Sequence, residues 1–193
     1  MEPVDYSRRM SIQEKGDMLW RAFPDRLEYY APDGALRGVV PYDKVKSVRL
    51  AFAPGRTQRS RFLMQLSGAR SQVTVSNMHF KGFGNFEDRW DTFEPLVRAV
   101  VAGVNKANPA AQFRAGEKPA LYYLMLAFVA ASFGLLGTVI LALPLVPGNV
   151  TLSVVVKAAI ILFSLPLLFS WLVNARPRRF DPVDGLDAVL AAR

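Results

Sequence analysis

Two long apolar runs in the C-terminal half of the chain limit what it can fold into. Residues 120–143 contain no charged side chain, and residues 151–173 contain only Lys157. An α-helix rises by about 1.5 Å per residue, so the first run would be about 36 Å long, longer than a hydrocarbon core of about 30 Å. The two runs therefore predict a transmembrane helical hairpin over residues 120–173, with spans at about 120–143 and 151–173.

Basic residues flank the two runs, whereas the short segment that connects them holds only a Pro-Gly-Asn turn. The flanking residues are Arg114, Lys118, Arg176, Arg178 and Arg179. Because cytoplasmic segments of membrane proteins carry the excess of Lys and Arg, this pattern predicts that both termini are cytoplasmic. No apolar run of signal-peptide length follows the N-terminus. We therefore expect a multi-pass integral membrane protein with a linker at 107–119 and a cytoplasmic tail at 174–193.

The part of the chain before the apolar runs has the pattern of antiparallel β-structure. Short apolar stretches are separated by turn sequences such as Pro32-Asp33-Gly34. The predicted strands are residues 18–23, 26–30, 36–40, 45–52, 61–66 and 72–76. Short strands at a spacing of about ten residues are typical of a small sandwich or barrel.

The apolar spacing then changes from that of a strand to that of a helix. Apolar residues recur at intervals of three and four, which is one face of an amphipathic helix. They are Phe86, Trp90, Phe93, Val97, Val100 and Val104. Asn85 is the predicted N-cap, and Pro95 requires that the helix bends or begins there. The strands and the helix predict one α+β domain over residues 9–106, after an N-terminal tail of residues 1–8.

This order of elements resembles a pleckstrin-homology-like (PH-like) domain, in which a C-terminal helix with a tryptophan, here Trp90, follows the strands. The chain also resembles bacterial small membrane proteins that join an N-terminal PH-like domain to a C-terminal transmembrane hairpin. The resemblance implies a small antiparallel β-barrel or sandwich capped by one helix, and a place in the bacterial inner membrane. It also implies that the domain binds lipids or protein partners rather than acting as a catalyst.

Few residues of this chain are suited to catalysis or metal binding. It has no cysteine and a single histidine, His79, which excludes cysteine nucleophiles and zinc sites with two histidines. Such a lone histidine at a strand end is interpreted as hydrogen-bonded or solvent-facing. The acidic residues Glu87, Asp88 and Asp91 are interpreted as a helix start that complements the helix dipole. We therefore expect no enzymatic activity, no cofactor and no metal.

Charge is distributed unevenly along this chain, whose net charge is +8. No acidic residue lies between Asp43 and Glu87, although that stretch holds many basic residues. The candidate lipid- or partner-binding residues are Arg56, Arg59, Arg61, Lys44, Lys46 and Arg70. They form either a solvated face or a surface attracted to an anionic leaflet, to which each basic residue contributes about 1 kcal/mol. Nucleic acid is disfavoured as a partner because no aromatic residues are interleaved with these basic ones.

Two functions are consistent with these features. The first is a membrane-anchored, non-enzymatic interaction module whose PH-like domain docks to anionic lipid headgroups or to a membrane-protein partner. The alternative is an accessory subunit or assembly factor of a larger membrane complex, in which the hairpin makes the main contacts. Lys157 bears on both functions, because it either snorkels to the membrane surface or makes an intramembrane contact with another chain.

Overall fold

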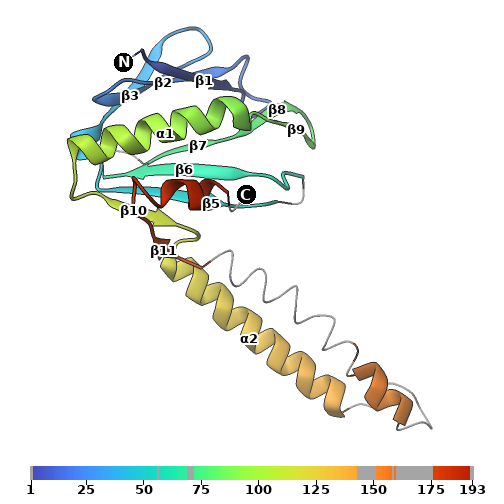
Figure 1. The fold of residues 1–193 in the computed structure, drawn as a ribbon. Helices are drawn as coiled ribbons and strands as arrows, with labels where there is room; N and C mark the ends of the chain where they lie inside the picture. The colour runs from blue at the N-terminus through green and yellow to red at the C-terminus, as the bar shows by residue number, and fades with distance from the viewer. Residues whose placement is uncertain are drawn as a thin grey trace. The chain divides into compact units, whose positions relative to one another are not determined.

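The structure, a computed structural model, describes residues 2–55, 57–68, 72–142, 151–157, 159 and 176–191. The chain forms two compact units, and the first, called the core domain below, joins residues from two separate parts of the chain. The core domain is Met1–Gly116 with Arg178–Arg193, and the second unit is Glu117–Pro177. In Figure 1 the red C-terminal segment accordingly lies among the strands of the N-terminal part.

The first four strands form an antiparallel sheet in sequence order. They are β1 (Val4–Arg8), β2 (Met18–Ala22), β3 (Arg26–Tyr30) and β4 (Leu36–Pro41). The segment predicted as an N-terminal tail is a strand because Tyr6 is buried and donates a hydrogen bond to the carbonyl of Ser76 at 2.6 Å. Gly34, at φ 81°, supplies the left-handed backbone that the turn between β3 and β4 requires.

The second sheet is mixed and has the strand order β11-β10-β5-β6-β7. Its strands are β5 (Ser47–Phe52), β6 (Phe62–Ser67), β7 (Val73–Ser76), β10 (Gln112–Ala115) and β11 (Arg178–Arg179). β5, β6 and β7 are antiparallel neighbours, whereas β10 pairs with β5 in parallel and β11 pairs with β10 antiparallel. A separate hairpin of β8 (Met78–Gly82) and β9 (Asn85–Asp88) leads into the long helix.

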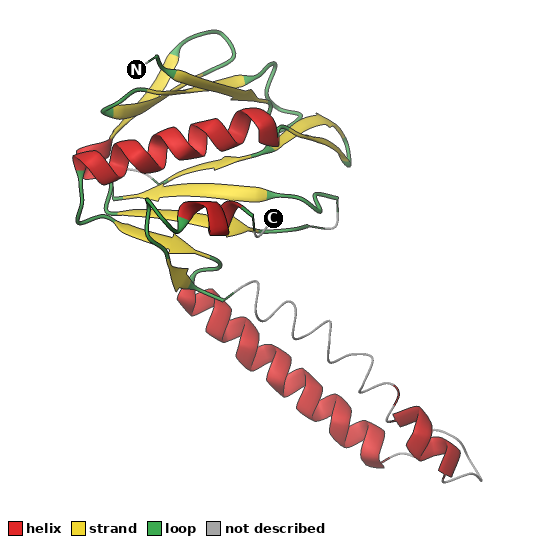
Figure 2. Cartoon of the chain, viewed as in Figure 1, coloured by secondary structure: helices red, strands yellow, loops and turns green. Residues whose placement is uncertain are grey.

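The helix α1 (Trp90–Ala107) lies between the two sheets, as Figures 1 and 2 show. It packs against β1, β2, β3 and the short 3₁₀ helix η1 (Tyr42–Lys44). Its buried apolar side chains are Phe93, Leu96, Val97, Val100, Val101 and Val104. The helix begins later than predicted, because Asn85 lies in β9 and the carboxylate of Asp88 accepts the N–H of Trp90 at 3.0 Å. Pro95 lies within the helix.

The C-terminal segment completes the core domain. The N–H of Phe180 donates to the carbonyl of Phe113, and the two rings pack edge to face at 5.9 Å. The helix α4 (Leu186–Leu190) buries three apolar residues in the same core, and Asp187 forms an ion pair with Arg98 of α1 at 2.7 Å. The chain therefore leaves the core domain after β10, forms the second unit with residues 117–177, and returns to the core domain at β11, which pairs with β10.

The second unit contains α2 (Pro119–Ala142) and a helical segment at 151–157. Several large side chains of α2 are exposed, including Leu124 and Phe128. Over the part of the chain that the structure describes, no helix combines the length and apolar character needed to cross a membrane. The predicted transmembrane hairpin, and with it the multi-pass location in an inner membrane with both termini cytoplasmic, is wrong over these residues.

The described parts of the two predicted spans differ in length. The first predicted span coincides with α2, Pro119–Ala142. The helical segment 151–157 rises by about 10 Å. The predicted outer loop at 147–149 and the rest of the second predicted span, 160–173, lie outside the described residues.

The predicted PH-like barrel is also wrong, although the chain is α+β. The prediction required antiparallel strands closed by one C-terminal helix. In the structure a further strand, β10, follows α1 and pairs in parallel with β5, which makes the second sheet mixed. The helix packs on β1 of the four-stranded sheet, and a second helix, α4, contributes to the core.

Loss of the core packing made by α4 should destabilise the core domain, although α4 is separated in sequence from the other elements of that core. We expect Leu190→Ala to lower the free energy of unfolding of the full chain by about 2–5 kcal/mol, the usual cost of truncating a buried leucine. Denaturant titration followed by circular dichroism measures this. Val183→Ala is the control in the same segment, because Val183 is 72% exposed and its truncation should change stability by less than about 0.5 kcal/mol. Equal stability of Leu190→Ala and the parent protein would show that α4 does not belong to the core.

Two buried tyrosines offer a matched comparison of hydroxyl groups. Tyr42 is fully buried and its hydroxyl has no hydrogen-bond partner among the described residues, whereas the hydroxyl of Tyr6 donates to Ser76. We expect Tyr42→Phe to leave stability unchanged or raise it by about 1 kcal/mol, because it removes an unsatisfied polar atom. Tyr6→Phe should lower stability by about 1 kcal/mol, because it leaves a buried carbonyl unpaired. Thermal unfolding measures both, and a larger loss for Tyr42→Phe than for Tyr6→Phe would contradict this account.

Candidate functional site

The basic residues predicted as a binding site lie at the two ends of the β5–β6 hairpin. Lys44 ends η1 and Lys46 precedes β5, whereas Arg59 and Arg61 lie in the loop between β5 and β6. Lys44, Lys46 and Arg59 are exposed and Arg61 is half-buried. Six residues of strand separate the two pairs, a distance of about 20 Å along β5. The structure therefore places them on one sheet but does not bring them into one cluster.

The other predicted site residues add little to this arrangement. Arg56 and Arg70 lie outside the described residues. Lys157 lies in the helical segment 151–157 and is half-buried. The intramembrane contact predicted for it depended on the transmembrane hairpin, which the structure contradicts.

The mixed sheet separates charge more sharply than the sequence predicted. Its five strands carry four arginines and no acidic residue, whereas the four-stranded sheet carries Asp5 and Glu28. The four arginines are Arg49 in β5, Arg114 in β10, and Arg178 and Arg179 in β11. The strands of the mixed sheet are therefore basic, with no carboxylates interleaved among their arginines.

Three of these arginines lie side by side across neighbouring strands. Arg114 is directly opposite Arg179 in the β10–β11 pair and directly opposite Arg49 in the β5–β10 pair. The same row continues into Gln65 of β6 and Thr74 of β7. Directly opposed residues share a face of a sheet, so the row is polar from one edge to the other. We call these five positions the arginine row.

Sequence reasoning missed Arg114 and Arg179 because it counted them as basic flanks of the apolar runs. Their strands are short, four residues for β10 and two for β11. A local signal existed for β10, because Ala111, Phe113 and Ala115 alternate with polar residues and are all buried. No local signal existed for β11, whose place depends on pairing with β10.

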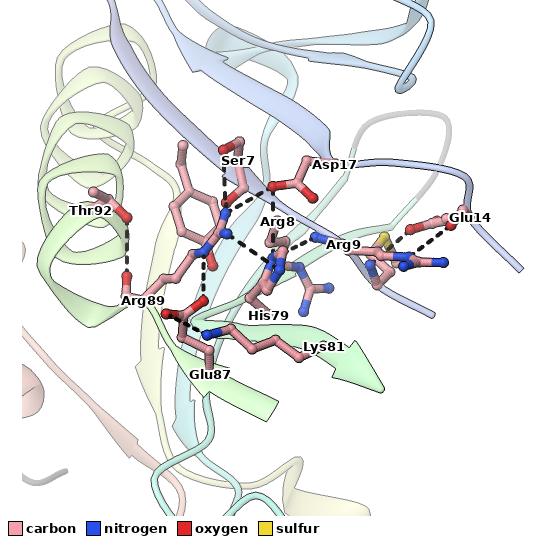
Figure 3. Close-up of polar contacts among 12 residues, drawn as sticks. Ser7, Arg8, Arg9, Glu14, Asp17, His79, Lys81, Glu87, Arg89 and Thr92 are labelled. Atoms are coloured by element: carbon pink, nitrogen blue, oxygen red, sulfur yellow. Dashed lines mark hydrogen bonds and ion pairs between the residues drawn. The ribbon is translucent and has the colours of Figure 1, made fainter. Parts of the chain in front are cut away.

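A second charged site joins β1, the loop after it, and the start of α1 through Arg89 (Figure 3). One guanidinium nitrogen of Arg89, Nη1, donates to the carbonyl of Ser7 at 2.8 Å and to Asp17 at 2.9 Å. Its Nε lies 3.6 Å from Glu87, which also pairs with Lys81 at 3.1 Å. Every charged group of this site has an opposite charge beside it, so the site holds the N-terminal strand in place.

His79 lies within this site and is 8% exposed. Its Nδ1 accepts the backbone N–H of Arg9 at 3.0 Å, so the proton of the neutral imidazole resides on Nε2, 3.3 Å from Arg89. Burial is the main cause that lowers the pKa of His79, the charge of Arg89 adds to it, and Asp17 and Glu87 act in the opposite direction. The interpretation of His79 as a hydrogen-bonded residue is confirmed.

Arg8, the neighbour of this site, is a buried cation. It is 8% exposed, its Nη1 donates to the carbonyl of Met78 at 2.9 Å, and its guanidinium lies 5.6 Å from the centre of the Trp20 ring. Its Nε has no hydrogen-bond partner among the described residues. Burial lowers the pKa of Arg8, and the positive charge of Arg61 lowers it further.

Two of the grooves among the described residues lie on the core domain. One, of about 380 Å³, lies between β1 and the start of α1 and combines Arg89 with Asp5, Asp88 and Asp91. The other, of about 690 Å³, lies between β10 and the returning C-terminal segment. Within the described ranges no group of three or more His, Cys, Asp or Glu side chains has the arrangement of a metal site.

Comparisons with known proteins give no relative for this chain: no family model, no curated protein and no solved structure matches it. The resemblance to PH-like domains and to small bacterial membrane proteins, inferred from element order and Trp90, is therefore wrong as an identification of the family. Many folds place strands before a helix that carries a tryptophan, so these two features do not identify a family. This chain also has a strand after the helix, β10, which pairs in parallel with β5 and has no place in the predicted PH-like order.

The lowered pKa of His79 predicts that stability depends on pH. The unfolded chain binds a proton at an ordinary histidine pKa of about 6.5, and the folded chain binds it only at lower pH, so the free energy of unfolding decreases as the pH falls through about 6.5. In His79→Asn, which retains a side-chain acceptor for the Arg9 N–H, this part of the pH dependence should disappear. Denaturant titrations of both proteins at several pH values measure it. Identical slopes would assign the dependence to other groups.

Proposed function

We propose that this protein is a non-catalytic binding module whose core domain docks on anionic lipid headgroups. The observation that carries the proposal is the charge of the mixed sheet, whose strands hold four arginines and no acidic residue. Lys44, Lys46, Arg59 and Arg61 extend this charge at both ends of the β5–β6 hairpin. None of these four forms an ion pair with a carboxylate of the described residues.

Electrostatic attraction between the basic residues and an anionic bilayer supports this docking. Basic residues near an anionic bilayer surface each contribute about 1 kcal/mol, and the contributions fall off within a Debye length of about 10 Å at 0.1 M salt. Arg49, Arg114 and Arg179 lie side by side on neighbouring strands, so several charges can approach the bilayer surface together. The net charge of +8 adds a long-range attraction to the same partner.

A binding role also agrees with the chemistry of the one histidine. The Nδ1 of His79 is engaged by the Arg9 N–H, and its Nε2 lies beside the guanidinium of Arg89. A general base needs a free nitrogen directed at a substrate proton. The proposal therefore assigns His79 to the support of β1 and assigns function to the basic surface.

Vesicle binding by the full chain tests the proposal. We expect the full chain to bind vesicles that contain phosphatidylglycerol more tightly than pure phosphatidylcholine vesicles, with the difference shrinking at 1 M salt, where the Debye length is about 3 Å. Lys44→Gln/Lys46→Gln and Arg59→Gln/Arg61→Gln should each weaken this charge-dependent part by about 2 kcal/mol, which is about 30-fold. Co-sedimentation measures both quantities.

A variant with the same loss of charge elsewhere provides the control. Lys15 lies in the loop between β1 and β2, and Arg37 lies in β4 of the other sheet; both are exposed. Lys15→Gln/Arg37→Gln should bind nearly as well as the parent protein. If all three double variants lose binding equally, net charge rather than the mixed sheet is responsible. If the parent protein shows no preference for anionic vesicles, the proposal fails.

A further inference from the structure

The arginine row contains like charges that the fold itself brings together. Arg114 lies directly opposite Arg49 on one side and Arg179 on the other, and neighbouring strands are about 4.8 Å apart. Like charges directly opposite each other in a sheet destabilise it. An anion bound between the opposed guanidinium groups would convert this repulsion into attraction.

The positive charges of Arg114 and Arg179 are not neutralised by carboxylates among the described residues of the core domain. Neither arginine forms an ion pair with a carboxylate of the described residues. The acid closest in sequence to Arg179 is Asp181, whose Oδ1 accepts the N–H groups of Val183 and Asp184 at 2.8 and 3.2 Å. These two bonds lower the pKa of Asp181 and hold its carboxylate against its own turn.

The side chains and strands of the row are held in place before any ligand binds. Arg49 donates from Nε to Gln65 at 3.1 Å and from Nη1 to the carbonyl of Gly116 at 3.0 Å. Arg114 donates to the side-chain oxygen of Gln112. The position of Arg179 is fixed by the next residue, Phe180, whose ring and N–H both contact Phe113. A site that is organised in this way loses less entropy on binding than a set of free side chains.

We propose that Arg114 and Arg179, supported by Arg49, form a binding site for a phosphomonoester, the headgroup of a phosphatidic-acid-type lipid. Guanidinium groups bind phosphate oxygens through paired N–H donors at about 2.7–2.9 Å, and two of them on adjacent strands match two edges of one phosphate. A phosphomonoester exposes three oxygens, whereas a phosphodiester exposes two. The inference rests on the proposed lipid docking and adds a defined site to it.

The first experiment uses pyrophosphate and the full chain. Binding to the folded state raises the melting temperature in proportion to RT ln(1 + [L]/Kd). At constant ionic strength we expect pyrophosphate to raise the melting temperature of the parent protein and of the control Arg37→Gln. The rise should be absent in Arg114→Gln/Arg179→Gln, whose ligand-free melting temperature should be unchanged or higher because repulsion is relieved. An equal rise in parent and double variant would overturn the site.

A charge-conserving variant separates this site from general electrostatic docking. In Arg114→Lys/Arg179→Lys the charge remains but the paired donors are lost, so the response to pyrophosphate should fall at least 10-fold in affinity. This variant should still bind anionic vesicles. The melting temperature of this variant without ligand should match that of the parent protein, because lysine keeps the charge at half-buried Arg114 and at exposed Arg179, and this match excludes misfolding as the cause of a lost response.

Vesicles distinguish a lipid from a free phosphate as the source of the ligand. The parent protein should prefer phosphatidic acid to phosphatidylglycerol at equal surface charge, and the lysine variant should bind both equally. A response to pyrophosphate without this preference would assign the site to a free anion and overturn the lipid headgroup as its ligand. Anionic vesicle binding that is the same for both lipids, with no response to pyrophosphate, would leave lipid docking intact and overturn the site.

Discussion

The parallel pairing of β10 with β5 is the contact on which the rest of the core domain depends. It buries Phe113 and Ala115 and engages backbone groups at both ends, since the N–H of Gln112 donates to Lys46 and that of Gly116 donates to Leu50. β10 then offers its free edge to β11, and Phe180 and α4 follow β11 into the core. The arginine row, the closure of the core and the return of the chain all result from this one pair of strands.

The sequence predicted the parts of the fold that have a local pattern. Six strands and the long helix are present within a few residues of their predicted bounds, because alternation and the three- and four-residue spacing depend only on neighbouring residues. β1 was not predicted because its inward residues, Tyr6 and Arg8, include a cation that is buried against Trp20 and Met78. β11 was not predicted because two arginines have no strand signal without β10 beside them.

The candidate site was predicted in part for the same reason. Charge can be counted along a sequence, so Lys44, Lys46, Arg59 and Arg61 were identified as members of an acid-free stretch. Arg114 and Arg179 are far apart in sequence, and only the register of β10 with β11 makes them neighbours. Arg114 and Arg179 also flank the two apolar runs, where they were interpreted as signals of membrane orientation. That interpretation depended on the transmembrane hairpin, which the described helices contradict.

The division of the core domain between two stretches of chain has a consequence for its synthesis. Residues 117–177 are made after β10 and before β11, and at about 5–20 residues per second they occupy roughly 3–12 s of translation. During that interval the edge of β10 is unpaired and the surface that α4 covers is open to water and to other chains. A nascent core domain is therefore most prone to aggregation in a defined window of its own translation, and that window closes only when residues 178–190 emerge from the ribosome.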